Sequence, residues 1–141
     1  MHDAATFYVA AELSLQNLKT EQLSDGTGAD LVVTRPGGAT VLVRVKGKTS
    51  PVWQAPFDMP RLKGHAVRLV VFVDLDPRIA PTPAYWIAPQ RWVLGEITRR
   101  HRAYFRRSGG ERPRSPESKH STIADDQLVR WRDRWGLFTE S

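Results

Sequence analysis

The chain contains no cysteine among its 141 residues. This absence excludes disulfide bonds, thiolate zinc sites and cysteine nucleophiles, and it is typical of a reducing compartment. The sequence also has no run of roughly 18 consecutive apolar residues, which a membrane-spanning helix would need, and no basic-then-apolar signal peptide at its N-terminus. A phosphate-cradling P-loop and a GxGxxG turn are both missing, so no motif supports nucleoside triphosphate or dinucleotide binding. We therefore expect a soluble, cytoplasmic protein with no membrane partner.

The positive charge is concentrated in one part of the chain. The formal net charge is +6, and the segment from Arg91 to Lys119 has nine Lys or Arg residues against three Glu, which accounts for the whole excess. Such a basic region is the electrostatic signature expected for a polyanion partner, above all a nucleic acid. The alternative is a solvated helix face followed by a basic loop. The length fits one domain, 1–141, that can bury a core without covalent staples.

The apolar patterning predicts an α/β fold with a central mixed β-sheet flanked by helices. Glycine and proline clusters mark the breaks between elements. From the N-terminus we expect a helix over 4–18, a short strand near 18–23, a strand hairpin around Pro36-Gly37-Gly38, an irregular loop over 49–65, a buried central strand over 67–74, a strand over 84–88, a helix over 90–107, a mobile basic loop near 108–121, and a C-terminal helix over 122–136 whose apolar positions are Leu128, Trp131 and Trp135.

The hairpin carries the residues with the clearest chemistry. Asp30 precedes its first strand, after Gly28, and Lys46 lies near the end of its second. Side chains of a strand alternate between faces, so Leu42, Arg44 and Lys46 share one side of the sheet. We therefore expect Asp30 and Lys46 to converge at one end of the sheet. Taken singly, Asp30 could equally cap a turn, and the lysines could be edge-strand charges.

These residues resemble the PD-(D/E)XK superfamily, whose restriction-endonuclease-like fold is shared by Holliday-junction resolvases and many small nucleases. The resemblance covers roughly 6–87. It places Glu12 at the helix-borne glutamate, Asp30 at the strand aspartate, and Arg44 and Lys46 at the acid and the lysine of the last motif. The order Ala-Glu-Leu, Ala-Asp-Leu, Val-Lys, followed by a strand like 71–75, adds to the likeness. The resemblance implies a Mg²⁺-dependent DNA endonuclease, and analogy with junction-resolving relatives makes a homodimer plausible.

The resemblance also implies a role for each residue. Asp30 would ligate Mg²⁺ directly, Glu12 would do so directly or through a water, and Lys46 would orient the attacking water and stabilise developing charge. Nucleic-acid phosphates would be contacted by the nearby basic residues and by those of the second long helix: Arg44, Lys48, Arg99, Arg100, Arg102, Arg106 and Arg107. His101 and His120 have no partner at metal-ligand spacing and are predicted to be non-catalytic.

Arg44 departs from the motif, because it stands where a second metal-binding acid or amide is expected. A guanidinium cannot coordinate a cation and cannot shed its proton. Three explanations are open: a site without metal that binds phosphate through Arg44 and Lys46, a migrated ligand such as Asp58 or Gln54, or an Arg44 that swings away. Whether the protein is an enzyme is therefore undecided. A different class of function, a protein-interaction module or inhibitor that uses the fold as a scaffold, is the alternative.

Overall fold

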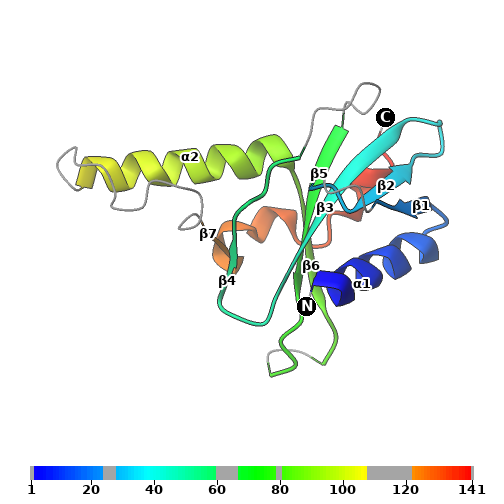
Figure 1. Cartoon of the computed structure of the whole chain (residues 1–141), viewed down its shortest axis with the longest axis horizontal. Helices are drawn as coiled ribbons and strands as arrows, with labels where there is room; N and C mark the ends of the chain where they lie inside the picture. The colour runs from blue at the N-terminus through cyan, green and yellow to red at the C-terminus, as the bar shows by residue number, and fades with distance from the viewer. Residues whose placement is uncertain (1, 24–27, 60–66, 79–80, 108–121, 141) are drawn as a thin grey trace.

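The computed structural model describes residues 2–23, 28–59, 67–78, 81–107 and 122–140. Within these residues there are two α-helices, a five-stranded sheet, a two-stranded sheet and three short 3₁₀ turns (Figure 1). In chain order these are α1 (His2–Leu15), β1 (Lys19–Gln22), β2 (Leu31–Thr34), β3 (Thr40–Lys48), β4 (Val52–Gln54), β5 (Val67–Asp74), β6 (Ala84–Pro89), α2 (Gln90–Arg107), β7 (Thr122–Ala124), η2 (Asp125–Gln127), η3 (Val129–Trp131) and η4 (Trp135–Phe138).

The large sheet is mixed, with the strand order β1-β2-β3-β5-β6. Strands β1, β2 and β3 form an antiparallel meander, β5 runs parallel to β3, and β6 returns antiparallel to β5. Gly38, with φ of +96°, supplies the left-handed residue of the β2–β3 turn. The predicted α/β class, the hairpin and the buried central strand are confirmed, whereas membership of the restriction-endonuclease-like fold stays a resemblance.

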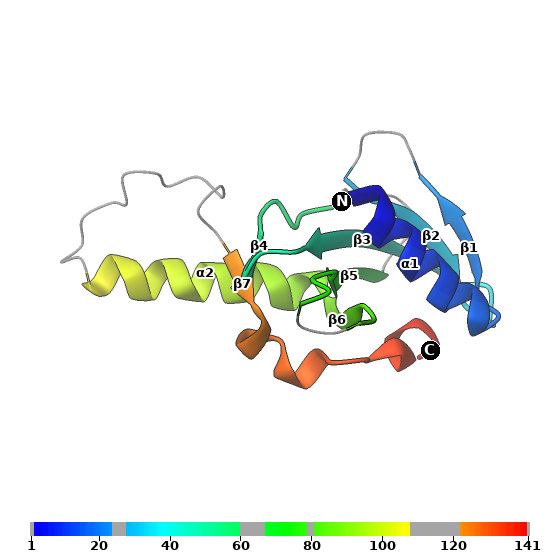
Figure 2. The same ribbon diagram turned by 90° about the horizontal axis from the view of Figure 1, so that it is seen from below.

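The two faces of the sheet carry separate hydrophobic clusters. One cluster, called here the α1-side core, packs α1 against Val41, Val43 and Val45 of β3. The opposite cluster, the α2-side core, contains Leu42 of β3, Val93 of α2 and the buried aromatics of β4, β5 and β6. The predicted alternation along β3 is therefore confirmed, and Figure 2 shows α1 lying across one face of the sheet. Arg44 and Lys46 belong to the face of the α2-side core.

The C-terminal segment differs from its prediction. Residues 122–136 are not a helix but form β7 followed by 3₁₀ turns, and β7 pairs antiparallel with β4. Strand β4 itself lies within the stretch predicted to be irregular. The three apolar residues do belong to the core, because Leu128 and Trp131 are buried and Trp135 packs against the core. They are carried there by a curved chain of short turns, not by a helix. The predicted mobile loop at 108–121 lies outside the described residues.

The remaining elements follow the sequence closely. Helix α1 begins and ends two to three residues earlier than predicted, β1 occupies the expected short strand, and α2 has the predicted bounds. Figures 1 and 2 both show the second half of α2 extending well beyond the edge of the sheet. None of the helices in the described part of the chain is long and apolar enough to cross a lipid bilayer.

Candidate functional site

Asp30 lies where β2 and β3 separate. The β2–β3 ladder ends at the pair Leu31 and Val43, while β3 continues beside β5 as far as Lys48. The carboxylate of Asp30 takes the place of the missing strand, because its Oδ2 accepts a hydrogen bond from the backbone N–H of Val45 at 2.7 Å. The side chain is only 15% exposed. The carboxylate is thus held at a fixed position at the splayed end of the hairpin.

His2 contacts the other oxygen of this carboxylate. The distance from its Nε2 to Asp30 Oδ1 is 2.8 Å. His2 is the first residue of α1, so Asp30 also lies near the positive end of that helix dipole, which favours a negative charge there. The sequence reasoning missed His2. No spacing in the sequence could have found it, because the contact depends on how α1 packs across the sheet.

Arg44 is clamped between two chain segments. Its Nη1 donates a hydrogen bond to the backbone oxygen of Asp58 at 2.5 Å and lies 3.9 Å from the Asp58 carboxylate. A Cβ added at Gly28, whose φ is +94°, would lie 2.7 Å from the same nitrogen, so a larger residue there would have to displace the guanidinium. The side chain is 17% exposed. Arg44 therefore joins the approach to β2 to the loop after β4.

Lys46 lies one step further along the same face. Its ammonium is 5.4 Å from the centre of the Phe57 ring. Burial, and secondly the charge of Arg44, lower the pKa of Lys46, while the carboxylates of Asp30 and Asp58 partly offset this effect. The predicted convergence of Asp30 and Lys46 at one end of the sheet thus matches the structure. We call the set of His2, Asp30, Arg44, Lys46 and Asp58 the Asp30 cluster.

Glu12 is not part of the Asp30 cluster. It lies ten residues after His2 on α1, which is about 15 Å along the helix axis. There its charge acts on Tyr85 of β6, whose pKa is raised to about 12 by burial and then by Glu12. Of the two candidates for a migrated ligand, Asp58 joins the cluster, whereas the exposed Gln54 of β4 makes no hydrogen bond to it.

The Asp30 cluster offers few oxygen ligands for a Mg²⁺ ion. Both oxygens of Asp30 are already engaged, and Asp58 faces Arg44. Arg44 and Lys46 add positive charge beside these carboxylates, which disfavours a further cation there. Within the residues that the structure describes, no group of three or more His, Asp or Glu side chains is arranged to hold a metal ion. Mg²⁺ binding at this cluster therefore stays a prediction of the family resemblance.

Lys48 corrects a prediction. Its side chain is 3% exposed, so it does not lie on a surface that a nucleic acid could contact. Its Nζ is 2.5 Å from Asp125 Oδ1 and 3.6 Å from Asp74 Oδ2, and it lies 4.1 Å from the centre of the Trp53 ring. We call these four residues the Lys48 cluster. The alternation of β3 puts Lys48 on the same face as Arg44 and Lys46. It could not show that β4 and β7 cover that end of the strand.

The arginines of α2 divide into paired and unpaired side chains. Arg99 forms an ion pair with Glu96, and Arg100 donates hydrogen bonds to the Thr122 carbonyl and to Gln127. Arg102 and Arg106 are exposed and have no hydrogen-bond or ion-pair partner in the described part of the chain. The side chain of Arg107 lies outside the described residues. The predicted basic surface is therefore centred on the projecting half of α2.

The comparisons with known proteins found no family model that matches this chain and no similar curated protein.

Proposed function

We propose that this chain binds nucleic acid, with duplex DNA as the expected ligand. The binding surface would be the sheet face that carries Arg44 and Lys46 together with the exposed arginines of α2. We further propose that the chain is a relative of the PD-(D/E)XK nucleases in which metal-dependent cleavage is impaired. One observation carries the proposal: Arg44 and Lys46 of β3 lie on the same side of the sheet as the basic helix α2.

The charges of this surface favour a phosphate backbone. Arg102 and Arg106 are exposed, so a ligand can approach their guanidinium groups from solvent. Projecting from the body, α2 can reach along a duplex beyond the sheet itself (Figure 1). Arginine forks match the geometry of phosphate oxygens, and each neutralised phosphate releases condensed counterions. Binding of this type is strong at low salt and weakens steeply as salt rises.

The same residues weigh against cleavage. Hydrolysis of a phosphodiester in this superfamily needs carboxylates that hold a metal, and the acid expected two residues before Lys46 is replaced by a permanent cation. Asp58 lies close by but is turned toward Arg44. The closeness of Asp30 and Lys46 at the splayed end of the hairpin supports the relationship to this superfamily. The proposal is therefore a DNA-binding surface that preserves part of a nuclease site without its metal.

The binding half of the proposal is tested by fluorescence anisotropy with a labelled DNA duplex between 50 and 200 mM salt. We expect Lys46→Ala and Arg102→Ala each to lower the slope of log affinity against log salt by about 1, because each removes one phosphate contact. Lys19→Ala is the matched control, since Lys19 is 72% exposed on β1 and pairs only with Glu21. Absence of binding at 150 mM salt would favour the protein-interaction alternative instead.

The catalytic half is tested with supercoiled plasmid and Mg²⁺ or Mn²⁺. We expect no nicking by the native chain, and gain of metal-dependent nicking in Arg44→Glu, which supplies the missing carboxylate. Arg44→Gln separates the loss of the guanidinium from the gain of an acid, because both variants break the contact with Asp58. Nicking by the native chain that disappears in Asp30→Asn and Lys46→Ala would show an active enzyme and contradict impairment.

A further inference from the structure

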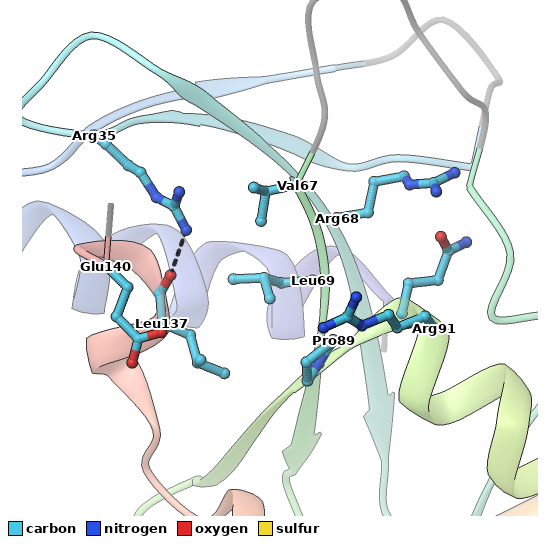
Figure 3. Close-up of a pocket in the computed structure, with 9 residues that line it drawn as sticks. Arg35, Val67, Arg68, Leu69, Pro89, Arg91, Leu137 and Glu140 are labelled. Atoms are coloured by element: carbon cyan, nitrogen blue, oxygen red, sulfur yellow. Dashed lines mark hydrogen bonds between the residues drawn. The ribbon is translucent and has the colours of Figure 1, made fainter.

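A second concave site lies at the other end of strand β5. It has a volume of about 290 Å³ and is bounded by the start of β5, the end of β6, the first turn of α2 and the C-terminal segment (Figure 3). Its floor and walls are apolar, formed by Val67, Leu69, Pro89 and Leu137. Lys46 pairs with Phe72 in the register of β3 and β5, four residues beyond Arg68, or about 13 Å along the strand. The site is therefore separate from Lys46.

Three arginines line this site, which is called here the arginine pocket. Figure 3 shows Arg35 on one side and Arg91 on the other, with the apolar residues between them and Arg68 at the rim. Arg35 donates from Nε and Nη2 to the carbonyls of Phe138 and Leu137, so three of its five N–H groups remain available. Arg68 and Arg91 have no hydrogen-bond or ion-pair partner in the described part of the chain. Among the lining residues that the structure describes, Glu140 is the one acidic side chain.

The first turn of α2 adds to the positive character of the pocket. Backbone N–H groups at a helix start have no intrahelical acceptor, and this helix has no acidic residue in its first turn to satisfy them. Gln90, the first residue of α2, lines the pocket and is only 4% exposed. Its side chain has no hydrogen-bond partner among the described residues. Its amide group can donate a hydrogen bond to a ligand in the pocket.

We propose that the arginine pocket binds a small organic phosphate, a monoester with an apolar body. Charge selects the head group: three arginines against Glu140 leave an excess of two positive charges, which a phosphate monoester dianion balances. The apolar walls select the rest of the ligand, because inorganic phosphate would leave them in contact with water. Gln90 would hydrogen-bond the phosphate or its ester oxygen. This proposal concerns a different ligand from the DNA proposed at Arg44 and Lys46.

Isothermal titration calorimetry with phenyl phosphate tests the proposal, with inorganic phosphate and benzoate as comparison ligands. We expect phenyl phosphate to bind at least about tenfold more tightly than either, since it alone combines a dianion with an apolar ring. Arg91→Gln should weaken it about tenfold, because Arg91 is exposed and supports no other contact in the described structure. Lys19→Ala, with the same change of charge, should leave it unaltered.

Five outcomes would overturn the proposal. No heat with phenyl phosphate at millimolar concentration would show that the pocket is not a ligand site. Equal affinity for inorganic phosphate would remove the role of the apolar walls, and equal affinity for benzoate would remove the preference for a dianion. Affinity unchanged in Arg91→Gln would place the ligand elsewhere. Displacement of bound phenyl phosphate by duplex DNA would make the pocket part of the DNA surface, whereas simultaneous binding supports two sites.

Discussion

Two buried tryptophans differ in what their indole nitrogens meet. The Nε1–H of Trp53 donates to the carbonyl of Val73 at 3.1 Å, and Lys48 lies over its ring. The Nε1 of Trp131 is buried without a hydrogen-bond partner. A buried donor without a partner carries a desolvation cost of about 1–3 kcal/mol. The two residues thus bury the same ring, but only Trp131 carries the desolvation cost of an unpaired indole N–H group.

This difference predicts unequal effects of the same substitution. Trp53→Phe should lower the free energy of unfolding by about 2 kcal/mol more than Trp131→Phe, because it strands the Val73 carbonyl while the second change removes an unsatisfied donor. Urea unfolding followed by far-UV circular dichroism measures both, and each variant is the volume-matched control of the other. Equal losses would mean that the hydrogen bond of Trp53 contributes nothing net.

The lowered pKa of Lys46 predicts how DNA binding responds to pH. A lysine contributes its charge only while protonated, and burial followed by Arg44 moves the loss of this proton to lower pH than in an ordinary lysine. As the pH is raised, affinity for a DNA duplex should therefore begin to decrease before pH 10.5, the ordinary lysine value, is reached. Lys46→Arg, whose guanidinium stays charged, should flatten this part of the profile. An identical fall in Lys46→Arg would assign the titration to another group.

At the residue scale, the sequence predicted which side chains of the hairpin lie close together, and it missed contacts that a helix or a loop makes with the sheet. Alternation and the hairpin suffice to bring Asp30 and Lys46 together, because both follow from the period of a strand. His2 and Asp58 come to the same cluster from a helix and a loop whose placement depends on tertiary packing. Glu12 was expected beside Asp30 through the family motif, but the axial rise of α1 carries it toward Tyr85 instead.

Short elements account for the main errors at the scale of secondary structure. Strands β4 and β7 have three residues each, too few for any periodicity to appear in the sequence. Their pairing joins segments almost 70 positions apart, and a network from α2 supports it, because Gln127 donates to Glu96 and receives a hydrogen bond from Arg100. The long elements were predictable for the opposite reason. An 18-residue helix and an 8-residue buried strand each display their pattern several times over.

The Lys48 cluster fastens this added layer to the main sheet. Lys48→Ala should lower the free energy of unfolding by about 3–5 kcal/mol, because it leaves the 5% exposed Asp74 without its cationic partner. Asp125→Ala should cost less, about 1 kcal/mol, since Asp125 is 44% exposed and water can replace the contact. Chemical denaturation of both variants and of the double variant gives the coupling. A loss in Lys48→Ala no larger than in Asp125→Ala would contradict this role.

At the scale of the whole molecule, the C-terminal segment closes both hydrophobic cores. Ile123, Leu128 and Trp131 belong to the α2-side core, and Phe138 belongs to the α1-side core. Arg35 holds the carbonyls of Leu137 and Phe138 from the hairpin turn. Figure 2 shows the segment passing from β7 beneath the sheet to the C-terminus. The two cores are therefore linked by one continuous segment, residues 122–140, called here the strap. Loss of the contacts at either end of the strap should lower the stability of the whole fold.

Substitutions in the strap test this linkage. Phe138 is fully buried, so Phe138→Ala should lower the free energy of unfolding by about 3–5 kcal/mol through lost burial and the cavity left behind. Val129→Ala, in the same segment but 72% exposed, is the control and should change it by less than about 0.5 kcal/mol. Circular dichroism and tryptophan fluorescence should report one coincident transition in both variants, because the strap couples the two cores. Separate transitions in Phe138→Ala, with the α2-side tryptophans unfolding later, would show that each core folds without the other and that the strap only spans them.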